Sequence, residues 1–384
     1  RGSSGKGWQP PEASWSRSFG LGWQTPFTVR YASNLDDGPW HGMPLGGFGA
    51  GCIGRSSRGD FNLWHLDGGE HWYGSIPDCQ FALWEKQGDQ VRVHALATEP
   101  TRDDSRPESG KPLSSWQWYP ASTEETSTGT YAARYPLSWN HYEGVFRAEV
   151  SCEAFSPILP GDYQRSSYPV AVFRWTLTNP TNKPLELSLL LSWRNTVGWF
   201  TNTDSSAEVH FRDDGSPEHN YAPAIGAGEG QSNRWIDGDG LIGVLLDGKR
   251  STPVAEGEGQ WCLALPDTLE GVELMRCSRW DPSSDGAELW QPFATDGVIP
   301  DSNNDRASRK GEHASAAIAV KLTLAPGETR EIPVAISWDL PVTSFATGVR
   351  DLRRYTDFYG VDGCHAAAIA AEALRDWRSW HEQI

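Results

Sequence analysis

The side chains best suited to chemistry lie close together between residues 65 and 72. His65, Asp67, Glu70 and His71 offer hydrogen-bonding groups, and Trp72 offers an aromatic face of the kind that packs against sugars. Two carboxylates three residues apart beside a tryptophan superficially resemble a glycosidase site. A glycosidase pair normally sits on separate elements, about 5 Å apart for retention and about 6.5–9.5 Å apart for inversion. Neighbours on one glycine-rich loop rarely hold that geometry, so these residues are candidates for binding a polar ligand; the simpler alternative is a loop that satisfies its own backbone.

A glycine-rich segment precedes this loop. Residues 49–54, GAGCIG, match the GxGxxG pattern of dinucleotide-binding folds. That pattern requires a strand before it and a helix after it, whereas here Pro44 and further glycines precede it, and RSSRGD at residues 55–60 follows as a hairpin turn. We predict instead a strand whose glycines let another backbone or a neighbouring domain approach closely, followed by a second strand over residues 60–66.

Neither a metal nor a cofactor is predicted. DGDG at residues 237–240 hints at calcium but lacks the spaced acidic ligands and distal glutamate of an EF loop, so a tight turn before a strand at Leu241 is the better interpretation. The six cysteines form no CxxC pair, which argues against a zinc site. Their wide, irregular spacing favours buried free thiols over three disulfides. No HExxH, GxSxG or P-loop motif occurs.

Charge and hydropathy exclude two classes of partner. The formal net charge of −17 argues against nucleic acid and anionic membranes, because both demand a basic face. No apolar run approaches the roughly 18 residues of a membrane span, so the chain is predicted not to be transmembrane.

The absence of an Asn-x-Ser/Thr sequon favours a cytoplasmic location. The opening RGSSGKG fits a tag remnant or a processed end, so a lost targeting segment stays an open alternative.

Alternating apolar and polar residues predict a mainly β fold, one large antiparallel β-sandwich of the supersandwich type. No alternation of strands with amphipathic helices occurs, which excludes a parallel α/β fold. The turn at residues 179–182 is predicted to join two strands of one sheet, and the turn at 325–328 to form the last hairpin of a sheet. Residues 98–129 and 201–233 are predicted to be long polar loops. The predicted strands cover residues 91–97, 146–155, 170–178, 185–193, 241–246, 261–265, 272–276, 314–324 and 329–337.

The end of the chain changes character. Residues 366–384 are alanine-rich with an apolar stripe, which predicts a helix. No capping glycine follows, which favours a helix that leads into a further region; a terminal helix docked on the sandwich is the alternative. We therefore divide the chain into a flexible N-terminal segment (1–20), a β-sandwich domain (21–345) and a helical linker (346–384).

Several ordered motifs resemble one family of glycosidases. Residues 42–72, GMPLGGFGAGCIGRSSRGDFNLWHLDGGEHW, resemble the glycine-rich signature near the start of glycoside hydrolase family 116, which contains the non-lysosomal glucosylceramidases and bacterial β-glucosidases. The resemblance extends from about residue 20 to residue 384. It continues in order and spacing through YPLSW at 135–139, CEAFSPILP at 152–160, PVAVF at 169–173, ISWDLPV at 336–342 and RYTDFYG at 354–360.

The resemblance implies a division of labour between two domains. In that family an N-terminal β-sandwich precedes an (α/α)6 toroid, and the nucleophilic Glu and the acid/base Asp both lie in the toroid. No residue of this chain is therefore assigned a catalytic role. The complete enzyme is expected to hydrolyse a β-glucoside or glucosylceramide with retention, the toroid coming from the same gene or from a separate chain. The sandwich would brace the toroid, and His65, Asp67, Glu70, His71 and Trp72 are the candidates for one rim of the active-site mouth.

Two other functions stay open at this point. One is a stand-alone carbohydrate-binding or assembly module without hydrolase activity. The other is an enzyme with its own site on the sandwich. The fold alone does not decide among the three, because one fold hosts many functions.

Overall fold

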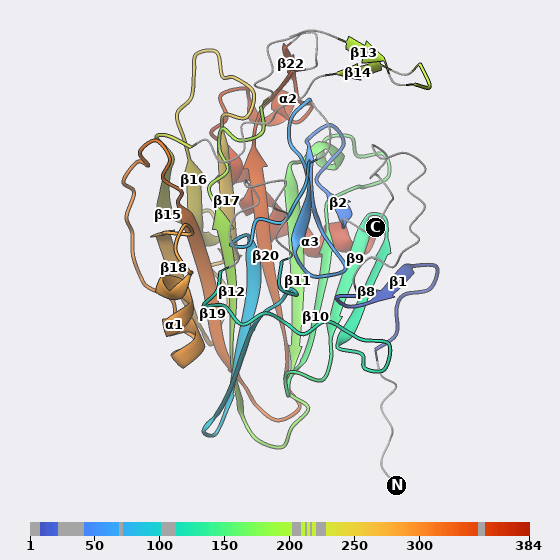
Figure 1. Ribbon diagram of the computed structural model, residues 1–384, viewed down its shortest axis with the longest axis vertical. Coiled ribbons are helices and arrows are strands. Elements are labelled where there is room, and N and C mark those ends of the chain that lie inside the picture. Colours follow the sequence, from blue (N-terminus) through green and yellow to red (C-terminus); the bar gives the residue numbers. More distant parts are fainter. Residues whose placement is uncertain are drawn as a thin grey trace.

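Two antiparallel β-sheets packed face to face form the body of the molecule, which confirms the predicted fold class (Figure 1). The computed structural model describes residues 8–21, 42–68, 72–100, 113–201, 209–211, 213–215, 217–219, 228–344 and 350–384. The nine-stranded sheet has the order β1-β8-β9-β10-β11-β20-β17-β16-β15. Its strands are β1 (Trp15–Ser18), β8 (Gly129–Arg134), β9 (Leu137–Tyr142), β10 (Glu149–Phe155), β11 (Val170–Thr178), β15 (Ser232–Gly238), β16 (Leu241–Asp247), β17 (Gln260–Pro266) and β20 (Thr329–Asp339).

The second sheet has five strands in the order β18-β19-β12-β6-β7. Its strands are β6 (Gln80–Gln87), β7 (Gln90–Ala95), β12 (Leu185–Arg194), β18 (Val272–Trp280) and β19 (Ser315–Leu324). The smaller elements belong to neither large sheet. They are β2 (Met43–Leu45), β3 (Cys52–Arg55), β4 (Phe61–His65), β5 (Trp72–Tyr73), β13 (Val209–Phe211), β14 (Pro217–His219), β21 (Val342–Ser344), β22 (Arg350–Leu352), and the helices α1 (Ala287–Asp296), α2 (Thr356–Tyr359) and α3 (Ala366–Gln383).

Each large sheet is buried on part of its outer face as well as on its inner face, because a helix packs against the outer face. On β11, Phe173 and Trp175 point into the core between the sheets, whereas Val170 and Val172 belong to a second core beneath α3. The helix presents a stripe of small and large apolar residues to that core: Ala366, Ile369, Ala370, Ala373, Leu374, Trp377 and Trp380. Helix α1 covers the outer face of the five-stranded sheet in the same way. The predicted helix is thus confirmed, and its apolar stripe is docked on the sandwich.

Two predicted hairpins are instead arches that cross from one sheet to the other. β11 lies in the nine-stranded sheet and β12 in the five-stranded one, and β20 and β19 are separated in the same way. The fully buried Asn179 holds the two arches together: its backbone N–H donates to Glu328 O, its backbone oxygen accepts from the Gly327 N–H, and its side chain donates to Leu324 O. The hairpin prediction is wrong because an alternating pattern turns one apolar face of each strand towards the core in a hairpin and in an arch alike, so the pattern does not specify the sheet.

The glycine-rich residues 42–72 contribute a four-stranded antiparallel sheet, β2-β3-β4-β5. β3 and β4 form a hairpin with Trp64 buried in the core between the large sheets. No helix follows the GxGxxG residues, so the rejection of a dinucleotide fold is confirmed. The DGDG segment is likewise the predicted tight turn: Gly238 pairs with Leu241, and the two residues between them, Asp239 and Gly240, have φ values of 53° and 82°, as a type I′ turn requires.

The structure also tests the predictions on the cysteines and on membrane-spanning helices. No disulfide joins the six cysteines, all of which lie in the described part of the chain. Cys79, Cys152, Cys262 and Cys277 are buried, as predicted, whereas Cys52 is half-buried and Cys364 is exposed. Among the described residues, no helix is both long enough and apolar enough to cross a bilayer.

Candidate functional site

A groove of about 510 Å³ contains two of the predicted site residues, His65 and Asp67. It lies between the four-stranded sheet, the turn that joins β8 to β9, and the hairpin of β21 and β22. These segments are far apart in the sequence. Its lining residues are Pro44, Gly46, Gly47, Phe48, Gly49, Gly51, Cys52, His65, Asp67, Tyr135, Thr343, Asp351, Leu352, Arg353 and Arg354.

Glycines make the close packing around this groove possible. A Cβ added to Gly46 would lie 2.3 Å from the carbonyl oxygen of Gly51, and one added to Gly47 would lie 2.4 Å from the backbone of Ser167. Gly51 has φ +78°, and a Cβ there would lie 2.8 Å from the carbonyl oxygen of His65. The predicted role of these glycines, to admit another backbone, is therefore confirmed.

Arg353 forms the charged floor of the groove. Its side chain is almost fully buried, and its two terminal nitrogens donate to Gly49 O at 3.2 Å and Leu66 O at 2.8 Å. Burial lowers the pKa of the guanidinium below its ordinary value, and the nearby acidic groups Glu256 and Asp67 partly oppose that effect. One buried cation thus fixes the turn between β2 and β3, which carries Gly49, against the loop that follows β4.

Glu256 holds the opposite side of the same region. One of its carboxylate oxygens accepts the backbone N–H of Gly68 at 2.9 Å and that of Ser344 at 2.6 Å. The side chain is buried, so these charge-assisted hydrogen bonds tie the loop after β4 to strand β21.

The rim of the groove is apolar. Phe48 is 58% exposed, Tyr135 53% and Leu352 48%, and these are three of the eight large apolar side chains exposed in the part of the chain that the structure describes. Isolated exposed apolar residues are ordinary, but several around one groove mark an interaction site. The groove therefore combines an apolar rim with a floor that carries a cation, carboxylates and an imidazole.

The predicted loop residues are divided among three environments. His65 and Asp67 line the groove. Trp72 is buried in the core between the sheets, where its ring lies 6.2 Å from that of Trp64. Glu70 and His71 lie outside the described residues.

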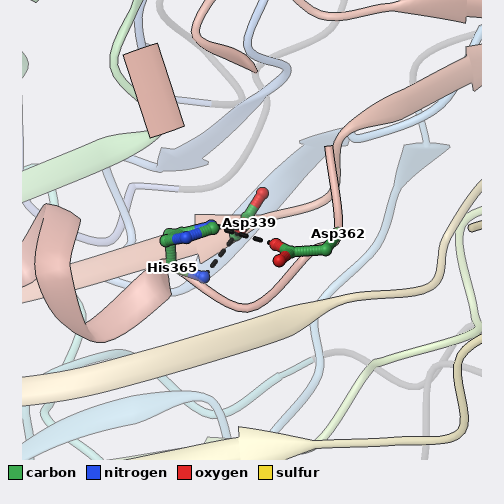
Figure 2. Close-up of side chains that lie close together, drawn as sticks. All are labelled: Asp339, Asp362 and His365. Carbon is green, nitrogen blue, oxygen red and sulfur yellow. Dashed lines mark hydrogen bonds and ion pairs between the residues drawn. The ribbon is translucent and has the colours of Figure 1, made fainter. Parts of the chain in front are cut away.

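A second cluster of titratable groups holds the beginning of α3 (Figure 2). Asp339 is the last residue of β20, Asp362 lies in the loop before α3, and His365 precedes the first helical residue. Nδ1 of His365 lies 3.4 Å from Asp339 and 3.1 Å from Asp362. Asp339 also accepts the Tyr355 hydroxyl at 2.9 Å and the backbone N–H of His365 at 2.8 Å.

Burial raises the pKa of Asp339 above its ordinary value, and the neighbouring charge of Asp362 adds to this. Hydrogen bonds from His365 and Tyr355 act in the opposite direction. The cluster is the one set of described residues whose His, Cys, Asp or Glu donors converge closely enough to hold a metal ion.

The sequence prediction missed the residues that complete both sites. Tyr135 opens the YPLSW motif, Asp339 belongs to ISWDLPV, and Arg353 directly precedes RYTDFYG. Each motif was recognised as a unit, but nothing in a single sequence brings residues 48, 135 and 353 together. These three residues become neighbours only through the order in which the strands pair in the folded chain.

Comparison with known proteins gives one match over most of the chain. The profile described as "beta-glucosidase 2, glycosyl-hydrolase family 116 N-term" matches residues 42–380. Among solved structures, a putative kojibiose phosphorylase from the human microbiome aligns at 8% identity and a TM-score of 0.37, over 88% of this chain and 33% of that one. A family GH92 α-mannosidase from Bacteroides thetaiotaomicron aligns at 12% identity and a TM-score of 0.30, over 89% of this chain and 35% of that one. The chain thus spans about a third of the length of these proteins.

Proposed function

Because the chain belongs to glycosyl-hydrolase family 116 as its N-terminal domain, we propose that it is the accessory domain of a retaining β-glucosidase or glucosylceramidase. In this role it braces an (α/α)6 catalytic domain, supplied by the same gene or by a separate chain, and forms part of the active-site rim. The substrate of the complete enzyme is a β-glucoside or glucosylceramide. Two carboxylates about 5 Å apart in the catalytic domain carry out the chemistry.

The observation that carries the proposal is the apolar rim of the groove. Phe48, Tyr135 and Leu352 expose about half of their surfaces while they surround a polar floor. Several exposed apolar side chains around one groove are typical of a surface that binds a partner. A partner that covers these side chains would remove them from water and place the floor of the groove at the boundary between the two domains.

Helix α3 supports this location of the partner. The backbone N–H of Gly47 donates to Tyr168 O at 2.9 Å, and the ring of Tyr168 lies 6.3 Å from that of Trp380 near the end of α3. The groove and the last turns of the helix are therefore neighbours. A domain held at the groove would also lie near the end of α3.

His65 and Asp67 are the described residues proposed for the rim of the active site, together with Glu70 and His71. Asp67 is buried beside Arg353, so its carboxylate is suited to fixing the loop, whereas the half-buried His65 can reach a ligand. This arrangement favours a contact with substrate hydroxyls and assigns no acid or nucleophile to the groove.

The direct test is a binding titration between this chain and the family 116 catalytic domain encoded with it. Phe48→Asp should weaken binding about tenfold or more, because a charge would replace an apolar contact at the rim of the groove. Val91→Asp is the matched control, since Val91 is 41% exposed on β7 and does not line the groove. No association, or equal losses for both variants, would reject docking at the groove. Binding of glucose or cellobiose by the isolated chain would favour a carbohydrate-binding module instead.

A further inference from the structure

The cluster at the beginning of α3 has the donor set of a metal site. Asp339 comes from the end of β20, whereas Asp362 and His365 lie in the loop that leads into α3, and each of the three directs one donor atom towards the others (Figure 2). The three donor atoms all lie within 4.8 Å of one another. The fold brings Asp339, which is 26 residues from His365 in the sequence, to this loop.

The distances from His365 to the two carboxylates match those expected around a shared cation. With metal–ligand distances of about 2.0–2.2 Å, ligand atoms in tetrahedral or octahedral geometry lie about 3.0–3.5 Å apart. Nδ1 of His365 lies 3.1 Å from one carboxylate and 3.4 Å from the other. Imidazole nitrogen with carboxylate oxygen suits zinc and its neighbours better than calcium or magnesium.

Two further observations point to a cation at the cluster. The side chain of Asp339 is fully buried, yet its ion-pair partner in the described part of the chain is His365, with no Lys or Arg beside it. The Nδ1 atom of His365 is itself buried and makes no hydrogen bond, although it faces two carboxylates. A buried carboxylate is normally paired or bound to a metal.

The surroundings resemble the outer shell of a metal site. The Tyr355 hydroxyl and the backbone N–H of His365 both donate to Asp339, which fixes the carboxylate as outer-shell groups fix a metal ligand. Asp362 is 64% exposed, so water can reach the cluster and complete a coordination sphere.

We propose that Asp339, Asp362 and His365 bind one zinc-like divalent cation. The ion joins the end of β20 to the first turn of α3 and thereby fixes the direction of the helix on the nine-stranded sheet. Because the metal binds the folded arrangement, it also stabilises the domain. The inference does not depend on the accessory role, since it concerns only this chain.

The experiment is a titration of the metal-depleted chain with zinc alone, followed by calorimetry and by thermal unfolding. One saturable site and a higher midpoint of unfolding are expected. Asp362→Asn and His365→Gln should each weaken binding about tenfold or more, since even outer-shell changes cost that much. Asp357→Asn is the matched control, because Asp357 is exposed on α2 outside the cluster, and it should bind zinc as the unaltered chain does.

Three results would overturn the inference. The first is no saturable binding. The second is zinc binding that Asp362→Asn and His365→Gln leave intact. The third is binding that is lost instead on Cys364→Ser, which would assign the ion to the exposed thiol near the cluster. Both cluster variants keep the apolar stripe of α3, and each is therefore expected to fold without zinc. The unfolding curve of each variant in the absence of zinc checks that it is folded.

Discussion

Replacing Arg353 with methionine tests whether a buried cation holds the groove together. The substitution keeps most of the side-chain volume but removes the donors to Gly49 O and Leu66 O. It also leaves Glu256 and Asp67 without the cation that faces them. Each hydrogen bond from a charged donor contributes about 1.5–3 kcal/mol, and removing one partner of a buried charge pair costs about 3–5 kcal/mol. Because the guanidinium no longer has to be desolvated, we expect a net loss of about 3–5 kcal/mol in the free energy of unfolding.

The assay is urea unfolding followed by tryptophan fluorescence, with Arg354→Met as the control. Arg354 is the next residue, is 61% exposed and pairs only with Asp357 at 3.5 Å among the described residues. An exposed pair of this kind contributes about 0–1 kcal/mol, so the control should unfold near the unaltered chain. If Arg353→Met loses less than about 1 kcal/mol, or no more than the control, the assignment of Arg353 as the element that fixes the groove is wrong.

Three further variants test the packing and electrostatics by the same unfolding assay. Asp78→Asn should cost about 3–5 kcal/mol, because Asp78 is fully buried against the guanidinium of Arg194; a near-neutral change would contradict this. Gly47→Ala should cost about 1–3 kcal/mol, since the added Cβ lies 2.4 Å from the backbone of Ser167; wild-type stability would show that the contact relaxes freely. Burial raises the pKa of Asp247, but hydrogen bonds and nearby arginines outweigh it and leave the pKa below 3.8. The resulting stability is present above pH 3.8 and is lost as the pH falls through the folded-state pKa, so Asp247→Asn should flatten the acid side of the stability profile; an unchanged slope would refute this.

The strands were predictable because their apolar residues are dense and bounded by turns. Residues 170–178 coincide with β11, and residues 185–193 with all but the last residue of β12. The sheet to which each strand belongs was not predictable. A strand such as β12 has one apolar face, formed by Leu185, Leu187, Leu189, Leu191 and Trp193, and that face meets the core equally well in a hairpin within one sheet or in an arch between two sheets. The side chain of Asn179 stabilises the arch by a hydrogen bond to Leu324 O, which is 145 residues away in the sequence.

The candidate site was predictable only in part, for a similar reason. The glycines and polar residues of 42–68 indicated a special segment, and the structure brings His65 and Asp67 into the groove. From the sequence, Trp72 fits a role in the core and a role facing a sugar equally well, because an indole packs in a core or on an exposed surface. Its burial follows from its pairing with Trp64 across β4 and β5. Arg353 has no sequence signal of its own beyond its place beside a motif.

The measurement that tests the central claim most directly is hydrolysis of an aryl β-glucoside by this purified chain alone. An accessory domain whose reactive acids lie in a partner should give no turnover above the buffer rate, and activity should appear only with the family 116 catalytic domain present. Turnover by the isolated chain that disappears on Asp67→Asn or Glu70→Gln would place the chemistry in the sandwich and contradict the account.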